Sequence, residues 1–151
     1  MVECLICIVI VGVMLTAALR TVGASNSAQL TASNRAVGGV LAQSLMDEIM
    51  LELFENPTSP SFGPESGETT RASFNDVDGY NNYTESPPKN FDGTTMSKLS
   101  GWTRSVTVAC VSASNLNQIA GADTGIKRII VTVSRNGTTM ATRAAIRTRA
   151  P

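Results

Sequence analysis

Histidine is missing from the sequence, and aromatic residues make up only 5% of its 151 positions. Without imidazole, the chain cannot form the catalytic triads and dyads that use histidine, and the commonest zinc ligand is also missing. Acid–base or metal chemistry would have to come from carboxylates or from three cysteines. The 12 basic residues balance the 12 acidic ones, so no net positive charge points to a nucleic-acid partner.

Other signs of catalysis are also missing from the sequence. It contains no phosphate-binding glycine loop, no nucleophile elbow and no supported pair of carboxylates, so we expect no enzyme. Cys4 and Cys7 lie three residues apart in an apolar run without the positive neighbours that activate a thiol, and we expect them to pack as small residues. Cys110 and Trp102 lie on an apolar strand face, where burial is the simpler explanation.

Apolar residues are concentrated at the N-terminus of this one-domain chain. Residues 1–19 include sixteen apolar residues, and no charge lies between Glu3 and Arg20. About 20 mainly apolar residues cross a bilayer, and this run is longer than the core of a secretory signal peptide. A signal peptide also begins with Lys or Arg rather than with an acid. We therefore predict a transmembrane helix at residues 1–20.

Glu3 is the anomaly in this segment. A carboxylate at the centre of a bilayer costs about 2.5 to 3.5 kcal/mol, and less near the interface. The residue either lies at the level of the lipid headgroups or has a partner within the apolar layer. The energetics alone do not separate these two alternatives.

A second helical pattern follows the apolar run. The apolar positions recur at spacings of seven and then four, which places them on one face of a helix and predicts an amphipathic helix at residues 21–55. Glycines along both helices favour a kink or local melting. The apolar positions are Leu30, Val37, Leu41, Leu45, Ile49 and Leu53, and the glycines are Gly12, Gly23, Gly38 and Gly39.

Residues 56–100 have the composition of a long loop, rich in Pro, Gly, Ser, Asn and Thr. A connection of this length is unusual in a compact domain, so we expect side chains that tie it down. Aromatic residues spread along the segment are the candidates: Phe62, Phe74, Tyr80, Tyr83 and Phe91.

The last third of the chain, residues 101–151, predicts a small antiparallel sheet of three to four strands. Residues 102–111 alternate, and two β-branched runs at 126–134 and 138–148 are separated by Asn136-Gly137, the strongest short hairpin signal. One face of the sheet would pack on the amphipathic helix in a two-layer α+β fold. The predicted inward residues are Val106, Val108, Ile129, Val131, Val133, Met140 and Ile146.

The balanced net charge hides a partition along the chain. Residues 36–97 carry ten acids against two bases, and residues 98–151 carry eight bases against Asp123 alone. Four of the acids crowd the C-terminal end of the predicted helix, where the dipole is already negative. The basic strands either pair with this end within one molecule or meet the acidic surface of a neighbour, and a solvated mixed surface is the third alternative. The four acids are Asp47, Glu48, Glu52 and Glu55.

These features together resemble a type IV pilin or a type II secretion pseudopilin: an apolar N-terminal helix with one glutamate at its start, an amphipathic helix and a β-rich head. The local match is the start Met1-Val2-Glu3-Cys4-Leu5 with the apolar run at residues 8–15. Further stretches are similar to the I-type, PilV-like minor pseudopilins, and the likeness covers most of the chain. These stretches are residues 41–49, 74–80, 85–88 and 101–106.

The resemblance implies a structural subunit of a type II secretion or type IV pilus filament, acting in initiation or at the tip. It implies a single pass through the inner membrane, with the head in the periplasm. The implied partners are other pilin or pseudopilin subunits, the inner-membrane assembly platform, prepilin peptidase acting on the precursor, and membrane lipid. The role implied for Glu3 is to neutralise the N-terminal amine of an adjacent subunit.

Two further expectations concern metal and processing. Asp76 and Asp78 stand two apart before Gly79, a spacing that suits calcium, which some major pseudopilins bind in a head loop; the EF-hand pattern is not completed, so an Asp-rich turn explains the pair better, and no cofactor is expected. The family's basic leader is missing and Glu3 stands two places early, so we expect the leader to lie upstream of this sequence. The alternative function is a single-pass membrane protein whose β-rich extracytoplasmic head binds a ligand by itself.

Overall fold

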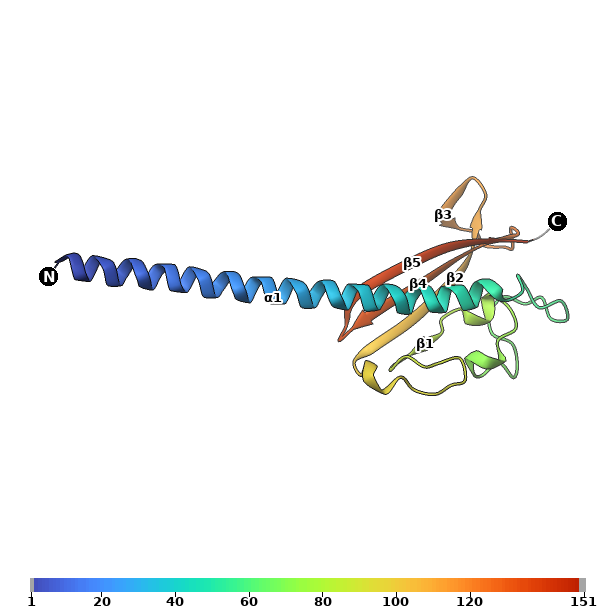
Figure 1. The fold of residues 1–151 in the computed structure, drawn as a ribbon. Coiled ribbons are helices and arrows are strands. Elements are labelled where there is room, and N and C mark those ends of the chain that lie inside the picture. The colour runs from blue at the N-terminus through green and yellow to red at the C-terminus, as the bar shows by residue number, and fades with distance from the viewer. Residues whose placement is uncertain (1, 150–151) are drawn as a thin grey trace. The chain divides into compact units, whose positions relative to one another are not determined.

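The structure is a computed structural model that describes residues 2–149, and only the backbone at Leu5. Residues 1, 150 and 151, at the ends of the predicted domain ranges, lie outside this description. The chain divides into two compact units, residues 1–36 and 37–151, and each is described by itself. The described elements (Figure 1) are α1 Val2–Leu51, η1 Arg71–Ser73, η2 Asp78–Tyr80, β1 Thr84–Glu85, η3 Ser97–Leu99, β2 Trp102–Ser112, β3 Asn115–Ile119, β4 Ile126–Arg135 and β5 Thr138–Thr148.

Helix α1 is α-helical throughout, including the glycines where local melting was expected. It ends at Leu51, four residues before the predicted boundary. Gly38 has a packing role instead, because a Cβ atom at this position would lie 2.8 Å from the Cβ atom of Met140 on β5. The absence of a side chain at Gly38 thus allows the helix to lie close to the sheet.

The sheet is antiparallel, with the order β1-β2-β4-β5, and β3 pairs with the end of β2. The three strands predicted from alternation are confirmed as β2, β4 and β5. Asn136 and Gly137 have φ values of 48° and 80°, the positive values that the predicted hairpin turn requires. Two strands, β1 and β3, were not predicted, so the sheet has five strands rather than three to four.

The core of the head lies between the sheet and the part of α1 from residue 37 on (Figure 1), which confirms the two-layer α+β fold. Ile129, Val131 and Val133 of β4 are fully buried. They belong to the same core as Leu45 and Ile49 of the helix. One inward prediction is wrong: Ile146 pairs with Arg128 on the opposite face of the sheet. A bulge next to Val133 explains this shift.

The bulge changes which residues of β5 face the helix. Val133 pairs with Ala141 and Ser134 with Thr139, which leaves Met140 between two pairs. From Ala141 on, the odd-numbered residues of β5 therefore share the face of Val133. Ala141 and Ala145 pack on the core together with Met140.

The segment predicted as a loop is tied down by three of its five aromatic residues. Phe74, Tyr80 and Tyr83 meet edge to face, with ring centroids 4.8 Å apart for Phe74 and Tyr80 and 5.6 Å apart for Phe74 and Tyr83. Tyr80 is fully buried in the core, whereas Phe62 and Phe91 are exposed. The segment therefore forms part of the packed head.

Candidate functional site

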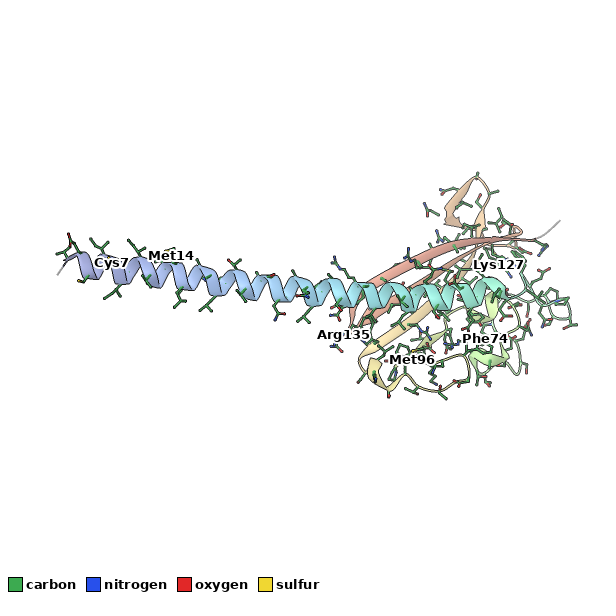
Figure 2. The ribbon with its side chains drawn as sticks, viewed as in Figure 1. Cys7, Met14, Phe74, Met96, Lys127 and Arg135 are labelled. Atoms are coloured by element: carbon green, nitrogen blue, oxygen red, sulfur yellow. The ribbon has the colours of Figure 1, made fainter. Side chains whose placement is uncertain are left out.

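The first unit is an apolar helix whose side chains are uncovered. Every described side chain at residues 2–19 is exposed, and Figure 2 shows Cys7 and Met14 projecting from the helix. The Thr16 hydroxyl bonds within the helix, donating to the Val13 carbonyl oxygen at 2.9 Å. A helical segment whose exposed side chains are apolar on all sides, apart from Glu3 at its start, suits hydrocarbon or the interior of a helical assembly.

This helix carries the predicted assembly residue at its beginning. It is long and apolar enough near the N-terminus to cross a membrane. Glu3 lies in the first turn and its side chain is exposed. The partial positive charge at a helix N-terminus favours a carboxylate there. The exposed position leaves this carboxylate accessible to a cationic group of another molecule.

The two aspartates considered for calcium are occupied by protein donors. Asp76 accepts hydrogen bonds from the Asn56 and Gly79 amides, both at 2.8 Å. Burial, followed by repulsion from Asp78, raises the pKa of Asp76. Asp78 accepts the Gly63 amide at 2.9 Å and is ion-paired with the ammonium group of Lys127.

This arrangement suits a structural role better than a calcium site. A cation at Asp78 would have to displace the buried ammonium group of Lys127, which already neutralises this carboxylate. Among residues 2–149, no group of three or more His, Cys, Asp or Glu side chains is gathered as for a metal ion. The two carboxylates instead join the segment after α1 to the turn at η2.

The crowded acidic end of α1 is compensated from the sheet. Lys127 donates to the Phe54 carbonyl oxygen, and Arg147 donates to the Glu52 carbonyl oxygen at 3.3 Å. Both carbonyl groups follow Leu51, the last residue of α1, so the two positive groups lie near the negative end of the helix dipole. Figure 2 shows Lys127 close to this end of the helix.

Arg149 adds an ion pair to the same region. Its Nη2 atom lies 2.6 Å from Oε2 of Glu55 and also contacts Asp123. Glu55, one of the four crowded acids, thus pairs within one molecule with Arg149, the residue that follows β5. Of the three alternatives considered for the basic and acidic segments, namely pairing within one molecule, pairing with a neighbour and a solvated surface, this ion pair supports the first for Glu55.

A second buried charge cluster was not predicted as a site. Glu85 is almost fully buried and accepts hydrogen bonds from Arg71, Arg104 and the Tyr83 hydroxyl, the last at 2.7 Å. Burial, then the bond to Glu85, raises the pKa of Tyr83 to about 12. Both arginines also donate to the Lys89 carbonyl oxygen, at 3.1 and 2.7 Å.

The same cluster reaches α1 through Glu48. Arg71 places Nε 2.9 Å from Oε1 of Glu48, and the Tyr80 hydroxyl donates to the same oxygen at 3.0 Å. Burial, then the charge of Glu48, raises the pKa of Tyr80. One signal in the sequence could have indicated the cluster: Arg104 occupies an inward position of a strand whose other inward residues are mostly apolar. An arginine at such a position requires a buried partner.

Comparisons of the chain with protein-family models, with curated proteins and with solved structures found no match. The two features that bear on function are the uncovered apolar helix with Glu3 at its start, and a head that packs its own core and pairs its buried charges.

Proposed function

We propose that the chain is a minor subunit of a type IV pilin-like filament, of the pseudopilin or pilin class. The observation that carries this proposal is the helix α1, which is uncovered and apolar over residues 2–19 and continues into the core of a folded head. A head that packs its own core leaves the apolar segment to be covered by something else. Lipid covers it before assembly, and the apolar helices of other subunits cover it in the filament.

Glu3 supplies the charged group that would pair one subunit with the next. A carboxylate within an apolar layer is costly unless it is paired. The N-terminal amine of an adjacent subunit supplies a positive charge at about the same depth, so pairing favours helices packed in register. An ion pair between Glu3 and the N-terminal amine of its own chain would not position a neighbouring subunit. In this proposal the pair therefore forms between two subunits.

The remaining parts of the proposal follow from filament assembly. The subunit is anchored in the inner membrane by a single pass, with its head in the periplasm. Its partners are other pilin or pseudopilin subunits, the inner-membrane assembly platform and membrane lipid, and prepilin peptidase acts on the precursor. A role in initiation or at the tip suits a minor subunit of a secretion system or a pilus.

The alternative is a membrane-anchored protein whose head binds a ligand alone. A cavity in the head, described below, favours this second candidate. The two candidates differ in whether Glu3 matters once the chain is in the membrane.

The test is a Glu3→Gln variant, which removes the charge and keeps the side-chain size. We expect normal membrane insertion and a large loss of incorporation into sheared filaments, both measured by immunoblot. Asp47→Asn, at an exposed carboxylate of α1 in the head, is the matched control and should incorporate normally. Incorporation of Glu3→Gln at the wild-type level would exclude the filament role and favour the anchored binding protein.

A further inference from the structure

A cavity of about 480 Å³ opens in the head between the segment after α1, strand β2 and the segment after β3. This volume lies within the range of about 300–1,000 Å³ typical of small-molecule sites. Its walls are mainly apolar and include Phe62, Val108, Cys110, Ile119 and Ala120. The three wall segments are distant in sequence, so the folded head creates the space.

The inner end of the cavity holds a neutral ion pair. Lys127 and Asp78 both line it, and both are almost fully buried. The ammonium group is also bonded to the Phe54 carbonyl oxygen and lies 4.3 Å from the centre of the Phe54 ring. Lys127 is thus fully engaged, and an anionic ligand would have to compete with Asp78 for it.

The mouth of the cavity has an excess of negative charge. Glu55 and Asp123 both line the cavity, and both bind the same Nη2 atom of Arg149. One guanidinium group faces two carboxylates, so one negative charge is left over. The amide of Gly125 and the charge of Arg149 lower the pKa of Asp123, which keeps it ionised. Burial is the main cause of the raised pKa of the Cys110 thiol, and the charge of Asp123 raises this pKa further.

We propose that this cavity binds a small organic cation with an apolar body, such as a primary amine on an aromatic or short aliphatic group. The apolar body would contact Phe62, Val108 and Ile119, and the ammonium group would lie between Glu55 and Asp123, sharing them with Arg149. Anions of the same size are disfavoured by the surplus carboxylate and by the engaged lysine. The site is complete within one chain, so the proposal goes beyond the filament role and does not depend on it.

The test uses three probes that share a phenyl ring and differ in net charge: benzylammonium is positive, benzyl alcohol is neutral and benzoate is negative. Each is titrated into the full chain in lipid nanodiscs, and the ¹³C-methyl NMR signals of Val108 and Ile119 are followed. We expect saturable shifts with benzylammonium, weaker binding of benzyl alcohol and the weakest binding of benzoate. This series needs no substitution, and it is measured on the isolated chain, so its failure is distinct from a failure of filament incorporation.

Two matched pairs of variants locate the site. Ala120→Leu fills the cavity and should abolish binding, whereas Ala144→Leu, at an exposed residue of β5, should not. Asp123→Asn should weaken the binding of benzylammonium severalfold and leave the binding of benzyl alcohol unchanged. Asp92→Asn, at a loop acid outside the cavity, should change the binding of neither probe. Absence of saturable shifts, equal binding of benzoate, or unchanged binding in Ala120→Leu would each overturn the proposal.

Discussion

Six charged side chains are buried in the described part of the head, three basic and three acidic. Burying an ion pair adds little net stability, because desolvation offsets the attraction, but removing one partner costs about 3–5 kcal/mol. A misplaced segment would leave a charge unpaired. We infer that these residues select which segments of the head meet. They are Arg71, Arg104, Lys127, Asp76, Asp78 and Glu85.

Glu52 shows the opposite case, a carboxylate whose charge opposes folding. Burial, then the charges of Glu48 and Asp76, raises the pKa of Glu52 above its ordinary value of 4.5. A raised pKa means that the folded state holds the proton more tightly than the unfolded state. The charge therefore penalises folding above the raised pKa, and the penalty vanishes below about pH 4.5, where both states are protonated.

Glu52→Gln should accordingly stabilise the head at pH 7, by less than about 1 kcal/mol because the side chain is partly exposed to solvent. The measurement is denaturant unfolding of the full chain in detergent, followed by the fluorescence of Trp102, the one tryptophan, which is buried. The gain should shrink as the pH falls through the raised pKa of Glu52 toward 4.5, and it should be absent below 4.5. A gain that is equal at both pH values, or a loss at pH 7, would contradict the assignment of this charge as unfavourable.

At the scale of elements, the contact between α1 and β5 depends on one glycine. A Cβ atom at Gly38 would lie 2.8 Å from the Cβ atom of Met140 and 3.4 Å from Ala141, neither of which is the end of a flexible side chain. The neighbouring Gly39 has open space around it. The two glycines have the same intrinsic cost in a helix, about 1 kcal/mol relative to alanine.

Gly38→Ala and Gly39→Ala should therefore change stability in opposite directions. We expect Gly39→Ala to stabilise the head by up to about 1 kcal/mol, and Gly38→Ala to destabilise it through overpacking, which costs about 1–3 kcal/mol. The same unfolding measurement separates them. If Gly38→Ala stabilised the head as much as Gly39→Ala does, the close approach of helix and sheet would be disproved.

Strands with a side-chain pattern were predictable, and strands without one were not. Alternation and the Asn136-Gly137 turn predicted β2, β4 and β5 almost to the residue. β1 has only two residues, which pair with β2, and the Val106 amide donates to the carbonyl oxygen of Tyr83, just before β1. All five residues of β3 are exposed, so burial left no pattern in its sequence.

The features of the candidate site also divide into those that the sequence could predict and those that it could not. The apolar helix and Glu3 are consecutive in the chain and could be found from composition alone. The partners of Glu85 lie 14 and 19 residues away, and Lys127 lies 49 residues from Asp78. Such pairs depend on the folded path of the loop, which has no periodic signal to predict it. The cavity has the same origin, since its walls come from separate segments.

At the scale of the whole molecule, the net charge of zero combines parts with different roles. The apolar helix has Glu3 as its one charge before Arg20, and the head pairs its acidic and basic segments internally. These ion pairs form within the head, whereas the apolar helix is uncovered, and we propose that this helix is the part that binds a partner. The central claim is therefore that this helix packs against the helices of other filament subunits.

The most direct measurement places a photocrosslinking residue in that helix. Ile10 is exposed within the apolar segment, and p-benzoylphenylalanine at this position can react with any C–H group it touches. Irradiation of assembled material, followed by mass spectrometry, should identify adducts with the apolar N-terminal helices of pilin-like subunits. Adducts with lipid alone, under conditions in which filaments are present, would contradict the account.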